Sequence, residues 1–297
     1  MSELLVIDIG NSVFKISYKD EMMEFNSKIK KIDINTMDFA ESIIYEDECF
    51  AISQGDYVHD TFKANKEGLE QFILYAISTM IKDKEVLDVN LMLNLPVNQL
   101  INKEVLKSRL QNTYQFTVNS PKNSLNKYAR IVSIHKIGVV AESIACYYSL
   151  EDVTPFITIL DIGSKTINYA TFTEIGVNDI AKSNTLEFGI HDLYKDVIEY
   201  YKQENKTYSI ADIDSRIRAN KIKIPKDIKE NFIAKIKNGL LANGFLDFDD
   251  YSLRCCGGGS LVLGKELESG FSDVTILDNS VYRNIIGSKL IAESLGF

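Results

Sequence analysis

The sequence predicts an α/β protein built from two similar domains, and an internal repeat is the main reason. An apolar strand that ends in Asp-Ile-Gly occurs near the start of the chain and again near its middle. Each copy continues with two small or polar residues and a second strand of alternating apolar positions. Helical and strand patterns then alternate after both copies. A repeat at about half the chain length indicates a duplicated domain.

The two copies are similar in residue type and in position within their halves. The first runs from Val6 to Tyr18, and the second runs from Ile159 to Tyr169. The repeated aspartates are Asp8 and Asp161. Chance readily produces one Asp-x-Gly hairpin, but two copies that each open one half of a chain are far less expected. The repeat therefore favours two related domains over a single irregular one.

The rest of the first half alternates helices with strands. The spacing of apolar residues predicts an amphipathic helix with Leu69, Phe72, Ile73, Ala76, Ile77 and Met80 on its buried face. We then expect a strand at 89–95, a helix at about 98–110, a strand at about 129–135 and a helix at 138–150. Residues 29–63 do not fit the repeat, and we interpret them as an insertion that forms a small subdomain.

The second half follows the same order. We expect strands within 156–181, helices at about 190–203 and 225–242, a strand at 253–256, a helix from the glycines at 257–259 to about 268, a strand at 274–277 and a final helix at 280–295. Residues 205–224 are interpreted as a second insertion.

Composition and charge exclude several classes of function. The 33 Lys and Arg against 42 Asp and Glu give a formal net charge of −9, which argues against direct coating of nucleic acid. The densest basic stretch runs from Arg216 to Lys237; a solvated helical face is the favoured interpretation, and a nucleotide or DNA contact is the alternative. No apolar run approaches the length that spans a membrane. Four cysteines without CxxC spacing and three scattered histidines predict no metal cluster and a reduced, cytoplasmic location.

The two hairpins have the features of a phosphate-binding site. Glycine after each aspartate permits a backbone geometry in which consecutive N–H groups point at an anion. Hydroxyl groups and lysines nearby add donors and positive charge. The aspartates would repel phosphate, so we interpret Asp8 and Asp161 as ligands of a Mg²⁺ ion, through waters. The expected nucleotide contacts in the hairpins are Asp8, Gly10, Asn11, Ser12, Lys15, Gly163, Ser164, Lys165 and Thr166.

A third candidate element is a strand that runs into a glycine-rich turn and then a helix. It comprises Gly257, Gly258, Gly259 and Ser260 after the strand residues Cys255 and Cys256. Three glycines leave room for a flat base or a ribose against the backbone, and a helix N-terminus favours anions. The alternative is that the three turns are unconnected, since many strand–helix turns carry paired glycines.

These residues resemble the superfamily of actin, heat-shock chaperones and sugar kinases. Asp8 to Tyr18 is similar to its first phosphate motif, Asp161 to Phe172 to its second, and Cys256 to Leu263 to its adenosine motif. Gly138 to Ser143 resembles the first connecting helix, with its Ala-Glu-Ser, and Asn279 to Gly287 resembles the second. Within the superfamily the chain most resembles plasmid-segregation actins of the ParM type, on its short length, the Glu-Ser helix and Phe188 to Leu193.

The resemblance implies two RNase H-like domains that flank a nucleotide cleft, with small inserted subdomains. Domain I would comprise residues 1–155 and 280–297, and domain II residues 156–279. Glu142 would position the attacking water and Asp161 would lie near the metal and the water, which makes both catalytic. ATP or GTP with Mg²⁺ is the implied cofactor set. Lys165 and Asn168 depart from the usual second phosphate motif and put the details of hydrolysis in doubt.

The favoured function is a filament-forming ATPase for the segregation of plasmid or other DNA. A head-to-tail interface that does not close produces filaments. In such systems a separate DNA-binding adaptor joins the filament to its cargo, which agrees with the acidic charge, so we expect no direct nucleic-acid binding. No terminal amphipathic helix with a basic face is evident, so we expect no membrane binding. The alternatives are a small-molecule kinase of the sugar or acetate type on the same fold, and a nucleotide-gated cytoskeletal scaffold.

Overall fold

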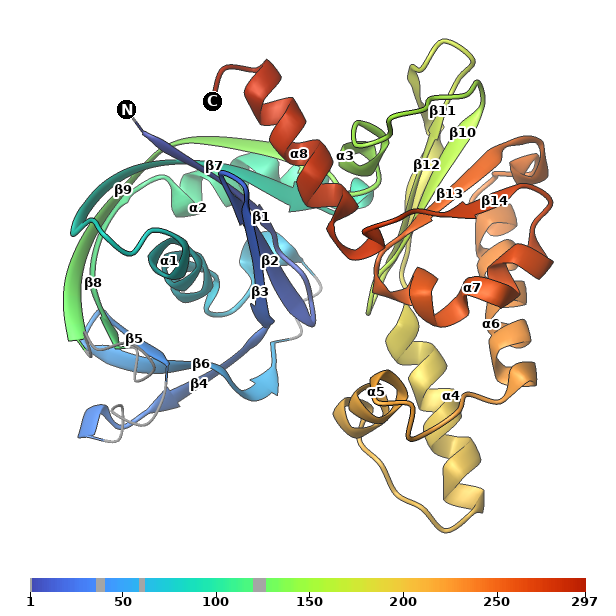
Figure 1. Ribbon diagram of the computed structural model, residues 1–297, viewed down its shortest axis with the longest axis horizontal. Helices are drawn as coiled ribbons and strands as arrows, with labels where there is room; N and C mark the ends of the chain where they lie inside the picture. The colour runs from blue at the N-terminus through green and yellow to red at the C-terminus, as the bar shows by residue number, and fades with distance from the viewer. Residues whose placement is uncertain (1, 36–40, 59–61, 120–126) are drawn as a thin grey trace. The chain divides into compact units, whose positions relative to one another are not determined.

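The computed structural model describes residues 2–35, 41–58, 62–119 and 127–297, and the chain forms two compact units (Figure 1). Unit 1 consists of Met1–Leu95, Gln99–Ala141 and Asn284–Phe297, and unit 2 consists of Pro96–Asn98 and Glu142–Arg283. Each unit contains its own β-sheet and helices. The predicted α/β class is confirmed.

Unit 1 contains a nine-stranded mixed sheet in the order β3-β2-β1-β7-β9-β8-β5-β6-β4. Its strands are β1 (Glu3–Asp8), β2 (Val13–Tyr18), β3 (Glu21–Asn26), β4 (Lys28–Ile32), β5 (Ser42–Tyr45), β6 (Glu48–Tyr57), β7 (Val86–Leu95), β8 (Thr113–Asn119) and β9 (Lys127–Ala141). β1 pairs antiparallel with β2 and parallel with β7, which is parallel to β9. The residues interpreted as the first insertion supply β4 to β6, which continue this sheet beyond β8.

The sheet of unit 1 curves around helix α1 (Leu69–Met80), which has an apolar, buried sequence (Figure 1). The rings of Phe14, Phe25 and Phe72 stack with centroids 4.7 to 6.1 Å apart, and they join α1 to β2 and β3. This packing fixes β2, the strand that follows the first Asp-Ile-Gly turn. Unit 1 also contains η2 (Lys63–Asn65), most of η3 (Val97–Asn102), α2 (Lys103–Leu110) and nearly all of α8 (Arg283–Ser294).

The helix predicted at 138–150 is wrong over its first residues. β9 continues to Ala141, and Ile137–Ala141 pair in parallel with Leu91–Leu95 of β7. Consecutive β-branched residues, Val139 and Val140, favour this extended pairing over a helix. Only α3 (Ile144–Tyr147) is helical after the strand. Glu142 therefore lies in a turn between a strand and a short helix.

Unit 2 contains a five-stranded sheet in the order β12-β11-β10-β13-β14. Its strands are β10 (Ile157–Ile162), β11 (Ile167–Phe172), β12 (Asn178–Leu186), β13 (Ser252–Cys256) and β14 (Val274–Ile276). Its longer helices are α4 (Ile190–Gln203), α5 (Ile210–Arg218), α6 (Lys226–Ala242) and α7 (Gly258–Gly270), and the 3₁₀ helices η4 (Phe248–Asp250) and η5 (Ser280–Tyr282) complete the unit. The predictions of α4, α6 and α7 are confirmed to within two residues.

Two apolar clusters cover the sheet of unit 2. One contains residues of α4, α6 and α7, such as Leu193, Ile236 and Leu263, together with Leu160 of β10. The other contains Cys146 and Tyr147 of α3 with Ile157, Ile159 and Phe172. Strands β10 and β11 are consequently buried along their whole length. Within the described ranges, no helix has the length and apolar character that a membrane span requires.

Candidate functional site

The first Asp-Ile-Gly turn joins β1 to β2 in unit 1. Asp8 ends β1 and is paired across the hairpin with Lys15. The Gly10 N–H donates to the Asp8 carbonyl at 2.9 Å. A Cβ atom at Gly10 would lie 1.9 Å from the carbonyl oxygen of Val13, so the turn closes more tightly than any other residue permits. The backbone, rather than a long side chain, therefore forms this turn.

Two lysines contact the buried Asp8 carboxylate. The Lys15 ammonium donates to Oδ2 at 3.1 Å, and the Lys63 ammonium lies 4.0 Å from Oδ1. Burial acts to raise the pKa of Asp8, but the two lysines outweigh it and hold the pKa below its ordinary value. Asp8 is consequently a carboxylate at neutral pH, which suits an interaction with a cation or with water bound to one.

The turn also contains a polar atom without a protein partner. Among the residues that the structure describes, Asn11 Oδ1 is buried and accepts no hydrogen bond. A buried amide oxygen in this condition costs about 1–3 kcal/mol unless a ligand or water donates to it. Asn11 Oδ1 is therefore suited to accept from a water molecule or hydroxyl group of a bound ligand.

The second Asp-Ile-Gly turn joins β10 to β11 in unit 2, where α4 fixes its shape. The Gly163 N–H donates to the Thr166 carbonyl at 3.0 Å. The carbonyls of Gly163 and Ser164 accept from the first N–H groups of α4, those of Ile190 and His191, at 3.0 and 2.8 Å. These bonds satisfy orphan donors at the helix N-terminus and hold the turn rigid.

Gly189 lets α4 approach the turn closely. A Cβ atom at Gly189 would lie 2.7 Å from the Gly163 oxygen and from the Lys165 nitrogen. The segment from Phe188 to Leu193, which contributed to the family resemblance, is thus the segment that supports the second turn.

Glu142 lies in a strained turn in unit 2. Ser143 has φ 55° and ψ −48°, and the Ile144 N–H donates to the Glu142 carbonyl across it. This is a γ-turn with positive φ, which is rare and strained, and such strain is concentrated at functional sites. The buried carboxylate of Glu142 accepts from Asn168 Nδ2 of β11 at 2.7 Å. The carboxylate is therefore held in one orientation.

The glycine-rich turn lies beside Asp161. Gly257 has φ 81°, and a Cβ atom there would lie 2.3 Å from Asp161 Oδ1. At Gly259 a Cβ atom would lie 2.3 Å from Cγ2 of Ile162, whereas at Gly258 it would meet nothing within 4 Å. Gly258 is thus the position of this turn with open space in front of the backbone.

Ser260 is fully buried, and its hydroxyl interacts with the protein. It donates to the Gly257 carbonyl at 2.8 Å and lies 2.6 Å from the Ser280 hydroxyl. The Ser280 carbonyl in turn accepts from the Gly257 N–H at 3.0 Å. Ser260 thereby shapes the glycine turn.

The structure brings the predicted residues together in two sets. Unit 1 places Asp8, Gly10, Asn11, Ser12 and Lys15 in one turn, and unit 2 places Glu142, Asp161, Gly163, Ser164, Lys165, Thr166 and the turn from Gly257 to Ser260 around the carboxyl ends of β10 and β13. In the described part of the chain, no three His, Cys, Asp or Glu side chains are arranged to hold a metal ion.

Two residues of the sites were not identified from the sequence. Lys63 is distant from both hairpins in sequence, and only the fold brings it to Asp8. Asn168 was noted as a departure from the motif, but its bond to Glu142 gives it a defined place. The pairing of β10 with β11 places Asn168 opposite Asp161, a register that hairpin geometry could have indicated.

The basic stretch from Arg216 to Lys237 lies on and between α5 and α6, and three of its basic side chains pair with acidic neighbours. Arg218 pairs with Asp214 at 3.0 Å, Lys226 with Glu230 at 3.1 Å, and Lys229 with Glu266 at 3.1 Å. These pairings agree with the interpretation as a solvated helical face.

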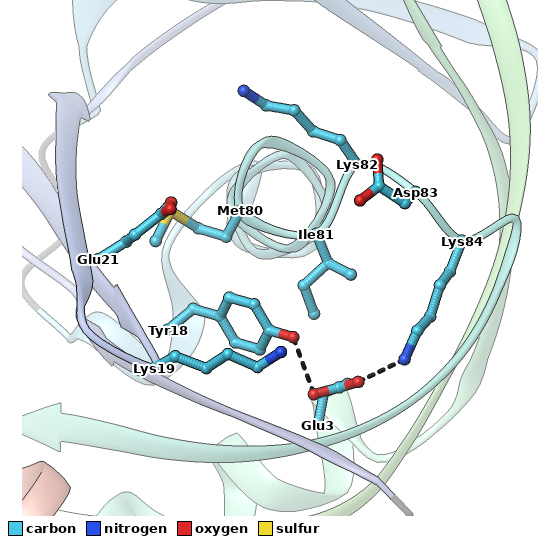
Figure 2. Close-up of a pocket in the computed structure, with 9 residues that line it drawn as sticks. All are labelled: Glu3, Tyr18, Lys19, Glu21, Met80, Ile81, Lys82, Asp83 and Lys84. Carbon is cyan, nitrogen blue, oxygen red and sulfur yellow. Dashed lines mark hydrogen bonds and ion pairs between the residues drawn. The ribbon is translucent and has the colours of Figure 1, made fainter.

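A cavity of about 310 Å³ lies in unit 1 at the end of β1 opposite Asp8 (Figure 2). Figure 2 shows Tyr18 and Lys84 converging on the Glu3 carboxylate, and Tyr18 donates to it at 2.9 Å. Hydrogen bonds from Lys84 and Tyr18 hold the pKa of Glu3 below its ordinary value. None of the predicted site residues lines this cavity.

Comparison with known proteins identifies similar proteins by sequence family and by fold. Residues 6–144 match the family described as actin-like proteins, N-terminal domain. No curated protein matches the chain in sequence. Many solved structures share the fold. Ta0583, an archaeal actin homolog in complex with ADP, has a TM-score of 0.80 at 15% identity over 98% of this chain and 99% of its own.

Two further structures are ParM proteins. The apo psk41 ParM protein has a TM-score of 0.71 at 15% identity over 99% of this chain and 98% of its own. A 15-stranded ParM filament from Clostridium botulinum has a TM-score of 0.80 at 17% identity over 99% of both chains. The protein therefore has the fold of the actin homologues. The resemblance to actin-like proteins is confirmed, and ParM proteins are among the structures that share the fold.

Proposed function

We propose that this chain is an actin-like ATPase whose β1–β2 and β10–β11 turns hold the phosphates of the same nucleotide. The observation that carries the proposal is the repeated hairpin, in which a buried aspartate lies within the last two residues of a strand and a glycine turn follows. Phosphoryl transfer depends mostly on positioning and charge neutralisation, and these turns supply both. In this proposal the two units correspond to actin-like domains I and II.

The residues present fit a nucleotide with Mg²⁺. Asp8 and Asp161 would hold the metal through waters, Lys15 would meet phosphate charge, and the unpartnered Asn11 Oδ1 would accept from a metal-bound water. The open face of Gly258 would receive the base or ribose. The metal, when bound, neutralises negative charge on the phosphates. ADP is bound by the similar archaeal structure, which supports the assignment.

Glu142 would orient the attacking water in hydrolysis. Its carboxylate is buried, and Asn168 fixes one of its oxygens, which leaves the group in a defined direction. The backbone at Ser143 is strained, and strained backbone conformations are concentrated at functional sites, where they help to fix the geometry. Orienting a water in this way requires the carboxylate to be ionised and immobile.

We further propose that nucleotide binding permits polymerisation and that hydrolysis destabilises the polymer. The similar structures include a ParM filament, which is the reason to test assembly here. A cytoplasmic filament of this kind would move plasmid or other DNA. The formal charge of −9 makes a separate DNA-binding adaptor the natural link to that cargo.

Light scattering and electron microscopy test this proposal together. We expect light scattering to rise when ATP and Mg²⁺ are added and to fall as phosphate is released. In electron micrographs we expect filaments only when nucleotide is present. ATP and GTP are compared in parallel, and a Gly10→Val variant is the control because Gly10 has no room for a side chain. A monodisperse monomer that neither binds nor hydrolyses either nucleotide would overturn the proposal.

A further inference from the structure

A directed chain of hydrogen bonds reaches the Glu142 carboxylate through side chains of β12 and β11 in unit 2. The Asn98 N–H donates to Thr185 Oγ1 at 3.3 Å, and the Thr185 hydroxyl donates to Asn168 Oδ1 at 2.7 Å. Asn168 Nδ2 then donates to Glu142 Oε2 at 2.7 Å. Every donor in the chain has one acceptor, so the chain has a single polarity that ends on the carboxylate.

The position between Thr185 and Glu142 requires an amide. Asn168 must accept with one atom and donate with the other, and Oδ1 also accepts from the Val97 N–H at 3.4 Å. An ionised carboxylate at 168 would face the Glu142 carboxylate with no proton between them. Both side chains are buried, with 1% and 5% exposed, so water screens such repulsion poorly.

The other end of the chain is a short connection. Residues 96–98 belong to unit 2, whereas Leu95 before them and Gln99 after them belong to unit 1. The N–H groups of Val97 and Asn98 bind Asn168 and Thr185, and Asn98 Nδ2 also donates to Glu187 Oε1 at 2.6 Å. The backbone of this segment is thus hydrogen-bonded to Asn168, the side chain that orients Glu142.

From this geometry we propose that Asn168 and Thr185 form a relay that positions Glu142 and makes its orientation depend on where residues 96–98 lie. Displacement of the segment removes a donor from Asn168 Oδ1 and one from Thr185, and the amide is then free to rotate away from Glu142. Hydrolysis would respond to the segment through two side chains, neither of which contacts nucleotide in this proposal. The catalytic part of this inference rests on the proposed function.

Substitution at 168 separates positioning from simple folding. We expect Asn168→Ala to lower kcat about 100-fold with little change in KM, since misplacing a reacting group by about 1 Å has an effect of this size. Asn168→Asp should be inactive at pH 8 and recover in part near pH 6, because a protonated carboxyl accepts with one oxygen and donates with the other as the amide does. Asn168→Ala should show no such recovery.

Substitution at 185 tests the rest of the relay. Thr185→Val removes the hydroxyl at constant shape and should lower kcat about 10-fold, whereas Thr185→Ser should keep it. Hydrogen exchange measured on the protein without nucleotide gives a second readout. We expect the Val97 amide to exchange faster in Asn168→Ala and the Asn98 amide to exchange faster in Thr185→Val.

A stability measurement without nucleotide keeps the relay testable if hydrolysis fails. Asn168→Asp should be less stable to urea than the wild type at pH 8, and the difference should shrink as pH falls toward 5, because the new carboxyl gains a proton beside Glu142. Asn184→Asp is the matched control, since Asn184 lies on β12 and bonds an exposed side chain, Asn243. It should show no such pH dependence.

The outcomes separate the two proposals. If the wild type does not hydrolyse nucleotide, that result would count against the proposed function. The stability and hydrogen-exchange measurements would still test the relay. If the wild type hydrolyses ATP, a normal kcat in the Asn168→Ala variant would overturn the relay but not the proposed function. Equal pH dependence in Asn168→Asp and Asn184→Asp would overturn the relay as well.

Discussion

Adjacent glycines in the turn before α7 predict opposite results from the same substitution. Gly257 has φ 81° and ψ 164°, a backbone conformation that residues other than glycine rarely adopt. Its Cβ would also lie 2.3 Å from Asp161 Oδ1 and 2.6 Å from the Ile162 oxygen, both in a buried strand. Strain of this kind costs about 1–3 kcal/mol before the clash is counted. We expect Gly257→Ala to lower the free energy of unfolding by about 3 kcal/mol or more.

Gly258→Ala is the matched control for folding and the test for binding. A Cβ at Gly258 meets nothing within 4 Å, and the residue begins the helix. The unfolding free energy should therefore stay unchanged or rise by up to about 1 kcal/mol. If the base or ribose lies against this glycine, the methyl group should weaken ADP binding about 10-fold. Urea unfolding without nucleotide and calorimetric titration with ADP measure the two effects separately.

Two results would refute this reasoning. Equal stability of the Gly257→Ala and Gly258→Ala variants would show that the turn does not require a glycine at 257. Wild-type ADP affinity in Gly258→Ala would show that the open space at this turn does not receive the nucleotide.

Three further predictions concern charge and reactivity. Lys15 and Lys63 lower the pKa of Asp8 in the folded state, so Asp8 stabilises the protein above the unfolded-state pKa of about 3.9, and this stabilisation is lost as pH falls through the lower folded value. Acid unfolding of the wild type should show this loss, and acid unfolding of Asp8→Asn should not. Identical acid-unfolding curves for the two proteins would contradict the prediction. Glu142→Gln should lower kcat about 100-fold or more while ADP affinity stays within about 2-fold, measured by phosphate release and calorimetry; a fall in both would indicate a folding defect instead. Burial raises the pKa of the Cys255 thiol to about 12, so a thiol reagent at pH 8 should react with it only after unfolding, and rapid reaction of the native protein would contradict the buried strand.

The fold and most of the candidate site could be predicted because the decisive signals are local. Asp8 and Asp161 each lie within the last two residues of an apolar strand and precede a glycine turn, as strand and turn chemistry predicts. The helix at 69–80 is likewise predicted by its apolar periodicity. Such features depend on neighbouring residues, which a single sequence shows directly.

The features that were missed depend on pairing between distant segments. Residues 138–141 became a strand because β7 supplies a parallel partner, and a sequence pattern alone does not show that partner. Lys63 follows β4 to β6 in the sequence, and only the fold brings it to Asp8. The relay from Asn98 to Glu142 joins residues 17 to 87 positions apart, so no local motif contains it.

Hydrogen exchange with and without a nucleotide and Mg²⁺ tests the central claim most directly. The account predicts slower exchange of backbone amides at residues 8–15, 161–168 and 257–260 when ADP and Mg²⁺ are present, with little change around the cavity at Glu3 and Lys84. Protection at that cavity alone, or in only one of the two Asp-Ile-Gly turns, would contradict the claim that both turns hold the same nucleotide.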